Sequence, residues 1–531
     1  MQWIDSFLST YTGPYLLAQV ICIFLIYILG IAVLVPGTVN ANDRTNIGKS
    51  IRLVLSLGFP IGISVLIICG YIFLTVGIPF NVISVTLTLL VLALFFIALG
   101  CKKECYRRIS AQIKPIIAVA AVLICLLIIM FAVSGYTAMS VSNDSLYYFW
   151  QYPRAIVTYG GIRDQFDNFL TDTGLGAAII GTLPFLYGFG ETFGIQEFFH
   201  ICFIMFIGNA MYDALCENYP QINIKKRVII TVITVALFVV CTPAYVLAHW
   251  AMANMYFMEY MFMALYMMFR LQEDNNILNM IYMFMMLHSC AAMRMEGGIF
   301  VLLIIISASM LKNRSKWLVG TIVPIMILQG LYEFKIFGLF TIDNPYLFMT
   351  PIKAVVQFAM YVVVIVYLLV LRTKFDRVLK NHLPVTYIGI LVLANIVLMI
   401  SDPGHYIANL KAFAGNLYGQ SGWGILPYVL PGSLVVIVVL ILTYSDYSVK
   451  KAKEYFGKLD MNVVYWLFNT IAFVLVTIAV SFERGDNLNI DTGDSGNRVL
   501  LQVAPLIIFS IIIWIVDILT KTELIDEGNN E

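Results

Sequence analysis

Apolar runs follow one another along almost the whole chain, from Tyr15 to Thr520, with short polar stretches between them. Each run has roughly 16 to 25 residues, close to the ~20 that a helix needs to cross the hydrocarbon core of a bilayer. This pattern predicts an all-α polytopic membrane protein with about fifteen spanning helices. We expect them near residues 14–36, 51–75, 81–100, 115–137, 196–214, 228–247, 252–270, 277–292, 297–311, 317–337, 352–371, 384–401, 425–443, 463–481 and 499–519.

One further apolar run, 175–190, is short and interrupted by glycine and proline. We expect a half-inserted or interfacial segment here, because a full span needs a longer uninterrupted helix. This choice decides on which side of the membrane every later loop lies. The first run of the chain lacks the basic flank of a cleavable signal and is interpreted as a retained helix.

Composition and charge support the membrane class and argue against a soluble domain, a nucleic-acid-binding protein and a fold stabilised by disulfides or zinc. Hydrophobic residues make up 61% of the 531 positions and charged residues 12%, whereas soluble domains have about 45–50% and about 25%. The net charge of +1 provides no field that would attract nucleic acid. The nine cysteines are scattered, and Cys101 and Cys105 lack the further ligands of a zinc site. No disulfide framework, structural zinc or nucleic-acid partner is therefore expected.

Charge alternates between the two sets of loops and predicts the orientation. Lysine and arginine collect in one set, which the positive-inside rule assigns to the cytoplasm: 102–114, 225–227, 312–316, 372–380 and 450–458. Acidic residues collect in the other set: Asp144, Asp164, Asp167, Asp172, Glu191, Asp343, Asp402, Glu483, Asp486, Asp491 and Asp494. Four histidines, His200, His249, His288 and His405, also fall near external helix ends. We therefore expect a multi-pass cell-membrane protein with its polar site on the extracytoplasmic face.

The first of four long external loops, 138–174, is the strongest candidate for chemistry; the others are 338–351, 402–424 and 482–498. Asp144 stands just outside a helix end, and an amphipathic stretch that would lie along the interface follows it. Sugar transfer from a lipid-phosphate carrier needs a base and cationic or metal groups that stabilise the departing phosphate. Asp144 is the candidate base or metal ligand, with Asp164 and Asp167 as second carboxylates. Alternatively, Asp144 only caps the following helix.

Positive groups near the external ends are candidates for the donor phosphate. Arg294 and Glu296 lie between two apolar runs, where charges are costly unless paired or facing a polar cavity. A guanidinium suits phosphate oxygens, so Arg294 would bind the donor; the alternative is an ion pair with Glu296 at a tight turn. His249 and Arg498 are further phosphate candidates. Asn254 and Glu259 would support the site, since a carboxylate inside an apolar helix is a functional hypothesis by default.

Several segments in order resemble the GT-C class of membrane glycosyltransferases, which includes protein O-mannosyltransferases and the lipid A aminoarabinose transferase. The stretch NDSLYYFW from Asn143 is similar to the acidic first external loop of that class, and MRMEGGIF from Met293 to an Arg-x-Glu-Gly helix start. The resemblance implies that Asp144 is the essential aspartate and that Arg294 and Glu296 match the later motif. The segments 175–190, 241–270 and 496–509 also contribute, with Asn254 where an acid is common and Arg498 retained.

The resemblance implies an organisation in three parts: extra N-terminal helices in 1–110, a GT-C-like catalytic core in 111–340 and C-terminal helices in 341–531. It also implies an inverting transferase that moves a sugar from a polyprenyl-phosphate donor to an extracytoplasmic glycan, lipid or protein acceptor of the cell envelope. A divalent cation, Mg or Mn, would be bound at Asp144. The alternatives are a transporter or flippase of lipid-linked saccharides, which needs polar groups at mid-membrane, and a polysaccharide polymerase.

Overall fold

In the computed structural model, the described part of the chain consists of helices joined by turns and short connections, without strands. Nine described helices are long and apolar enough to cross a membrane, or ten if one bent pair counts as a single span. The chain is therefore a polytopic helical membrane protein. The described residues are 13–39, 47–110, 117, 121, 125, 150–162, 174–188, 195–241, 252–271, 277–294, 297–309, 311, 315–339, 350–370, 376–419, 423–457, 459–483 and 499–528.

Helices occupy the predicted spans wherever the structure describes them, but the number of about fifteen stays a prediction. The predicted span 115–137 lies outside the described residues apart from 117, 121 and 125. The segment predicted to be half-inserted contains α9 (Leu175–Leu186), a buried helix of 12 residues, which is about 18 Å long and shorter than the ~30 Å hydrocarbon core. Helices α13 (Ala253–Leu271), α14 (Ile277–Met293) and α15 (Gly297–Ala308) do not count among the nine candidate spans.

The chain divides into two compact units. The first contains residues 1–206, 248–305 and 314–369. Its helices are α2 (Gly13–Thr38), α3 (Ile47–Val76), α4 (Val82–Lys102), α5 (Cys105–Ser110), α8 (Tyr152–Tyr159), α9, the first half of α10 (Ile195–Asn218), α13 (Ala253–Leu271), α14 (Ile277–Met293), most of α15 (Gly297–Ala308), α16 (Ser315–Leu339) and α17 (Pro351–Val370).

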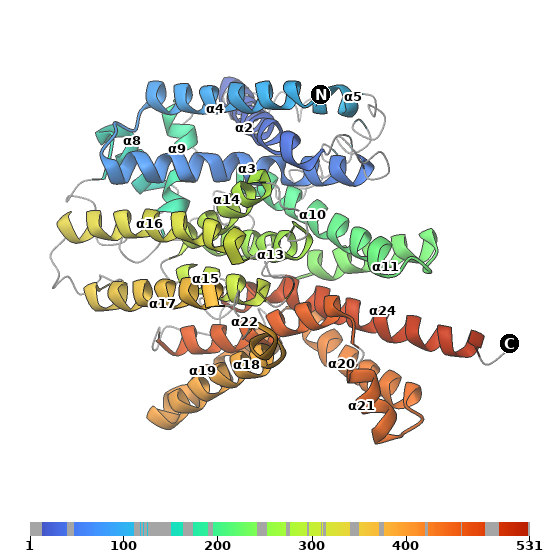
Figure 1. Ribbon diagram of the computed structural model, residues 1–531. Helices are drawn as coiled ribbons and strands as arrows, with labels where there is room; N and C mark the ends of the chain where they lie inside the picture. The colour runs from blue at the N-terminus through green and yellow to red at the C-terminus, as the bar shows by residue number, and fades with distance from the viewer. Residues whose placement is uncertain are drawn as a thin grey trace. The chain divides into compact units, whose positions relative to one another are not determined.

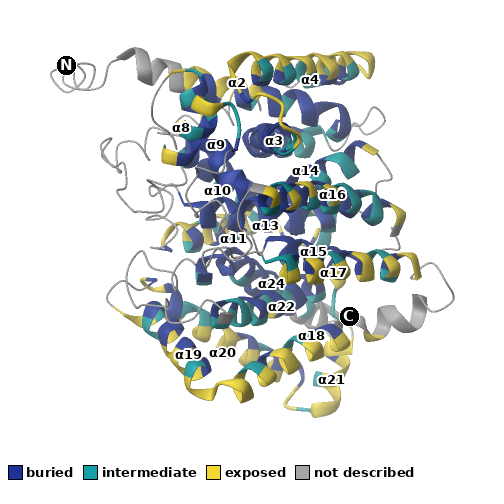
Figure 2. Cartoon of the chain, turned by 90° about the vertical axis from the view of Figure 1, so that its left-hand side faces the viewer, coloured by how far each residue is buried: buried dark blue, intermediate teal, exposed yellow. Residues whose placement is uncertain are grey.

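Helix α3 is the buried centre of this first unit. Its most apolar window is 94% buried, whereas that of α4 is 17% buried, and Figure 2 shows the contrast between the two helices. Helices α2, α9, α14 and α16 all pack on α3. The helices of 1–110 therefore share a compact unit with the central helices; whether the boundaries at 110 and 340 separate functional parts stays a prediction.

Glycines allow α2 and α3 to approach at backbone distance. A Cβ atom on Gly30 would lie 1.7 Å from the carbonyl oxygen of Gly58, and one on Gly62 would lie 2.1 Å from that of Ile26. Small residues four positions apart, here Gly58 and Gly62, are a common means of close helix packing in membranes. The contact between α2 and α3 thus depends on the absence of side chains at these positions.

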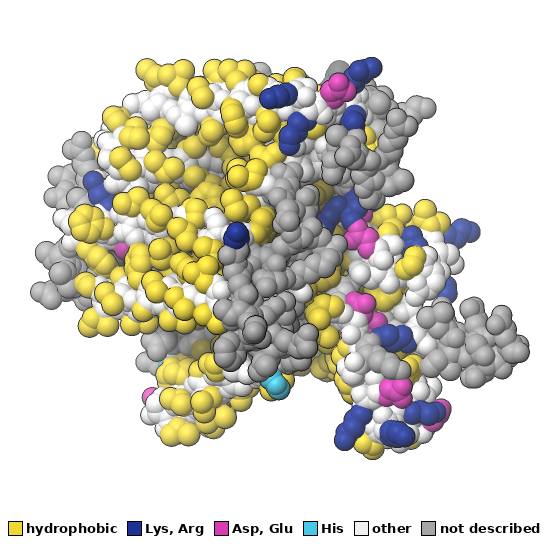
Figure 3. Space-filling model, viewed as in Figure 1, with side chains coloured by type: hydrophobic (Ala, Val, Ile, Leu, Met, Phe, Trp, Pro, Cys, Tyr) yellow, Lys and Arg dark blue, Asp and Glu magenta, His cyan; other side chains and the backbone are white. Residues whose placement is uncertain are grey.

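The start of α4 is bonded to the end of α8, whereas its other end is surrounded by basic side chains. At its start, the amide nitrogen of Phe80 donates to the carbonyl oxygen of Gly160 at 2.9 Å, which joins the α3–α4 connection to the end of α8. At its other end the ammonium of Lys103 donates to Pro36 O at 3.1 Å. Basic side chains gather there around α5 (Figure 3). By the positive-inside rule, the α5 end is the one expected in the cytoplasm.

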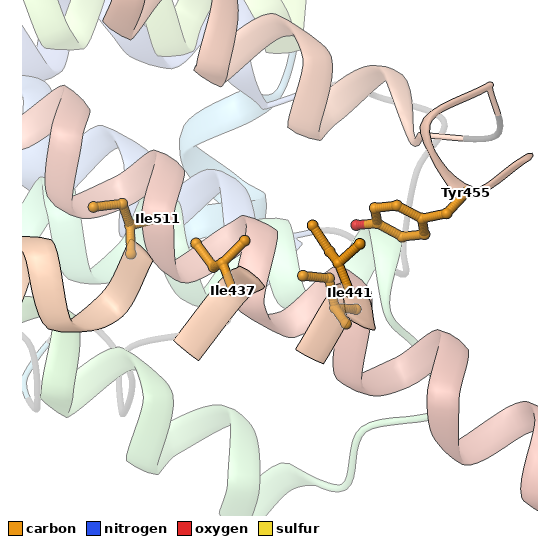
Figure 4. Packing of buried hydrophobic residues seen from close by; sticks show 5 residues of the cluster. Ile437, Ile441, Tyr455 and Ile511 are labelled. Atoms are coloured by element: carbon orange, nitrogen blue, oxygen red, sulfur yellow. The ribbon is translucent and has the colours of Figure 1, made fainter. Parts of the chain in front are cut away.

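The second unit contains 207–247, 306–313 and 370–531. Helices α22 and α24 pack along each other: the Trp466 and Phe509 rings lie 4.5 Å apart, and Thr470 Oγ1 donates to Ser510 Oγ at 3.1 Å. Figure 4 shows Ile437 and Ile441 of α20 between Ile511 of α24 and Tyr455 of α21, all members of one buried cluster. The helices are the rest of α10, α11 (Ile224–Val239), α18 (Asp376–Ser401), α19 (Pro403–Tyr418), α20 (Leu426–Tyr444), α21 (Val449–Gly457), α22 (Met461–Glu483) and α24 (Ala504–Gly528).

The prediction of a loop at 402–424 is wrong, because this segment contains α19. Helix α19 turns from α18 by 117°, and the side chain of Asp402 caps it by accepting from the amide nitrogen of His405 at 3.0 Å. Its buried face alternates aromatic residues with Asn409 and Asn416. These polar residues lower the local hydropathy, which explains why a search for apolar runs misses the helix.

A buried charge links the end of α24 to α21. The carboxylate of Asp517 is 2% exposed and lies 2.8 Å from the ammonium of Lys521, and it accepts from the hydroxyl of Tyr455 at 3.2 Å. Replacing Asp517 with alanine is expected to lower the unfolding free energy by about 1 to 2 kcal/mol, because it removes the hydrogen bond from Tyr455 to a charged group, while Lys521, which is 25% exposed, stays partly hydrated. Chemical denaturation in detergent micelles would measure this.

The matched control is Lys451→Ala, which breaks the ion pair with Asp446 between side chains that are 56% and 73% exposed. Exposed pairs contribute little, so this variant should unfold like the parent protein. Equal stability of the Asp517→Ala variant and the parent would contradict a structural role for the buried pair.

Candidate functional site

The sequence-predicted site residues fall into two groups. Asn254, Glu259 and Arg294 lie in the first unit and are described. The other candidates lie outside the described residues, so their predicted roles are neither supported nor opposed by the structure: Asp144, Asp164, Asp167, His249, Glu296 and Arg498.

The structure brings Arg294 and Asn254 together. Asn254 lies in the first turn of α13 and Arg294 directly after α14, two helices that pack side by side (Figure 1). The Arg294 Nη1 atom donates to Asn254 Oδ1 at 2.7 Å, and the two residues are 7% and 6% exposed. This contact fixes the direction of the guanidinium. A buried, oriented guanidinium is suited to binding an anion.

Gly174, the last residue of the predicted first external loop, lies against the backbone at Arg294. A Cβ atom on Gly174 would be 1.9 Å from the carbonyl oxygen of Ala292 and 2.6 Å from the amide nitrogen of Arg294. Only glycine allows this approach, since any side chain would overlap the backbone. The segment 138–174, which carries the predicted acids, therefore ends beside Arg294.

A second buried pair lies deeper along α13. Glu259 Oε1 is 2.6 Å from Nδ1 of His200 on α10, and the two side chains are 0% and 6% exposed. Glu259 follows Asn254 by five residues, about 7.5 Å along a helix. The other oxygen of Glu259 has no hydrogen-bond partner among the described residues. The sequence indicates both residues separately, but not that they form a pair.

The sequence reasoning missed a group of polar side chains on α16 and α17, here called the α16–α17 cluster: Gln329, Glu333, Gln357 and Tyr361. Gln357 Nε2 donates to Gln329 Oε1 and to Glu333 Oε1, both at 3.2 Å. The hydroxyl of Tyr361 donates to Gln329 Oε1. All four residues are at most 6% exposed. Their i, i+4 spacing on two consecutive spans is the signal that could have revealed them.

His288 is fully buried near the end of α14. Its ring lies edge-on to Tyr71 at 4.8 Å and parallel to Phe284 at 5.8 Å. Within the described residues, neither of its ring nitrogens has a hydrogen-bond partner. The described environment of His288 is therefore apolar and aromatic, unlike the solvated helix end that its place in the sequence suggests.

Among the described residues, no three His, Cys, Asp or Glu side chains are placed to hold a metal ion. The predicted Mg or Mn ligand, Asp144, lies outside that part of the chain, so the divalent cation stays a prediction. Comparisons with protein-family models, curated proteins and solved structures find no match. The resemblance to the GT-C class accordingly remains an inference from the sequence segments.

Proposed function

We propose that the protein is a membrane glycosyltransferase that passes a sugar from a polyprenyl-phosphate-linked donor to an extracytoplasmic acceptor of the cell envelope. The observation that carries the proposal is the position of Arg294. Its buried guanidinium is oriented by Asn254 at 2.7 Å, and its backbone lies against Gly174, where the acidic segment ends. This arrangement would bring a phosphate-binding cation close to the carboxylates proposed for catalysis.

In the proposed reaction, Asp144 accepts the proton of the acceptor's hydroxyl group, and the hydroxyl oxygen attacks the anomeric carbon of the sugar. The bond from that carbon to the phosphate oxygen breaks, and the configuration inverts. The leaving group is the lipid phosphate, whose negative charge Arg294 stabilises. Arg498 and His249 would assist with the phosphate. Asp164 and Asp167 would be the second carboxylates of the catalytic site, and Glu296, Asn254 and Glu259 would support it.

Binding of polyprenyl monophosphate to the purified protein in nanodiscs tests the role of Arg294. Arg294→Gln is expected to weaken binding about 10- to 150-fold, the effect of losing hydrogen bonds from a charged donor. Asn254→Asp should also weaken it, because the new carboxylate would compete with the phosphate for the guanidinium. Lys353→Gln, which removes an exposed positive charge on α17, is the matched control and should bind like the parent. Unchanged affinity of the Arg294→Gln variant would refute the assignment.

A specific observation also favours a transporter or flippase of lipid-linked saccharides. Such proteins use polar groups inside the membrane, and the first unit buries both the His200–Glu259 pair and the α16–α17 cluster. Proteoliposomes containing a fluorescent lipid-linked sugar separate the two functions. Transfer of the sugar to an added acceptor supports the transferase, whereas movement of the intact lipid between leaflets without transfer supports the alternative.

A further inference from the structure

The α16–α17 cluster gathers hard oxygen atoms around one point. Gln329 and Glu333 occupy one face of α16, and Gln357 and Tyr361 one face of α17, each pair four residues apart and therefore neighbours on its helix. The single Nε2 atom of Gln357 lies 3.2 Å from an oxygen of Gln329 and 3.2 Å from an oxygen of Glu333. The side-chain NH₂ group of Gln357, which carries a partial positive charge, therefore lies between the two oxygens.

The backbone of Gly298 on α15 lies against the α16–α17 cluster. A Cβ atom there would lie 3.0 Å from Gln329 Oε1, 3.0 Å from Gln357 Nε2 and 3.0 Å from the hydroxyl oxygen of Tyr361. Three polar atoms on two other helices therefore converge on the bare backbone of Gly298. Any larger residue would push at least one of them away, so the glycine keeps the group compact.

Glu333 is incompletely paired in this group. It is 6% exposed, and its Oε2 atom has no hydrogen-bond partner among the described residues. An ionised carboxylate inside a span is costly unless a positive charge compensates it. Among the described residues, the titratable groups that interact electrostatically with Glu333 include the hydroxyls of Tyr71, Tyr332 and Tyr361, which provide no positive charge. The group therefore has the composition of a site for a cation.

We propose that the α16–α17 cluster binds a sodium ion. The carboxylate of Glu333, the carboxamide oxygen of Gln329 and the hydroxyl of Tyr361 are its ligands, and a half-turn of the Gln357 amide replaces Nε2 with Oε1 as a fourth. All four are hard oxygen donors, which suit alkali and alkaline-earth cations. The single carboxylate selects a monovalent ion, because only one positive charge balances it in a medium of low dielectric constant.

The place of the cluster in the helices allows entry from the membrane surface. Glu333 lies six residues before the end of α16, and Gln357 six residues after the start of α17. Six residues correspond to about 9 Å of helix, and Gln329 and Tyr361, ten residues from the same helix ends, are about 15 Å from them. The cluster therefore extends from the outer part of the ~30 Å hydrocarbon core toward its middle. The α16–α17 connection is on the predicted external side, so sodium would enter from the extracytoplasmic medium.

Equilibrium binding of radioactive sodium to the purified full chain in nanodiscs tests the proposal, with choline chloride keeping the ionic strength constant. The parent protein should bind one sodium ion per chain saturably. Glu333→Gln keeps the shape but removes the charge, and it should weaken binding by at least about tenfold. The control Asp446→Asn removes an exposed carboxylate and should bind sodium as the parent does.

Other outcomes decide against the site. Absence of saturable binding to the parent protein overturns the proposal even if the Glu333→Gln variant fails to fold. Equal affinity of the parent and a folded Glu333→Gln variant overturns it as well. If calcium displaces sodium at equal or lower concentration, the charge argument for a monovalent ion is wrong. These readouts do not involve sugar transfer, so they stand or fall independently of the proposed enzyme activity.

Discussion

Replacing Asp144 with asparagine is expected to lower the rate of sugar transfer about 10²- to 10⁴-fold, the usual contribution of a general base. Asparagine has the size of aspartate but cannot accept the acceptor proton. Affinity for the lipid phosphate should change much less, because Arg294 is the proposed phosphate ligand. Initial rates in proteoliposomes with radiolabelled lipid-linked sugar, together with size-exclusion profiles, would separate lost chemistry from lost folding.

The matched control is Asp172→Asn, which removes an acid from the same predicted external segment without touching a proposed site residue. It should retain most of the activity. Full activity of a well-folded Asp144→Asn variant would remove the base assignment. If both variants lose activity equally, the effect belongs to the net charge of the segment and not to one carboxylate.

The second large effect is expected from Gly30→Ala. The added Cβ would lie 1.7 Å from the carbonyl oxygen of Gly58 and 2.6 Å from the amide nitrogen of Gly62. Both atoms belong to the backbone of α3, so no side-chain rotation relieves the overlap, and the helices must separate. Because α3 is the buried centre of the first unit, we expect a loss of more than about 3 kcal/mol in unfolding free energy. Denaturant titration in micelles would measure it.

Gly48→Ala is the corresponding control on α3. A Cβ atom on Gly48 would lie 3.8 Å from its nearest neighbour, Arg52 Nη1, which is an ordinary van der Waals contact. Alanine also favours helix by up to about 1 kcal/mol over glycine, so this variant should equal or exceed the parent in stability. Wild-type stability of the Gly30→Ala variant would show that α2 and α3 do not depend on backbone contact.

The sequence predicts the membrane class well because the length and hydropathy of a span are local properties. Helices α3 and α4 follow directly from their apolar runs, and the prediction of a polytopic helical protein is confirmed. Hydropathy does not distinguish the buried α3 from the largely exposed α4, since lipid and protein interior are similarly apolar. Helix α19 is missed for the opposite reason: Asn409 and Asn416 face the protein and dilute the apolar signal.

The candidate site is predictable only as a set of single residues. The sequence indicates Arg294, Asn254 and Glu259 because charged or polar groups among apolar runs are unusual. It does not show that Arg294 meets Asn254, or that Glu259 meets His200, since these pairs are 40 and 59 residues apart. The approach of Gly174 to Arg294 has no sequence signal at all, because glycine serves many purposes. Tertiary packing alone determines these contacts.

The sharp corner between α18 and α19 indicates how deep the residues of α18 lie in the membrane. Ser401, Asp402, Pro403 and Gly404 are all exposed there, and a charged, irregular backbone that touches hydrocarbon would lack hydrogen-bond partners. We therefore expect the corner to lie at the surface of the bilayer, where water can solvate it. Asn395, seven residues earlier on α18, then lies about 10 Å beneath it along the helix, where its bond to the carbonyl oxygen of Leu475 at 3.1 Å shields an amide from the acyl chains.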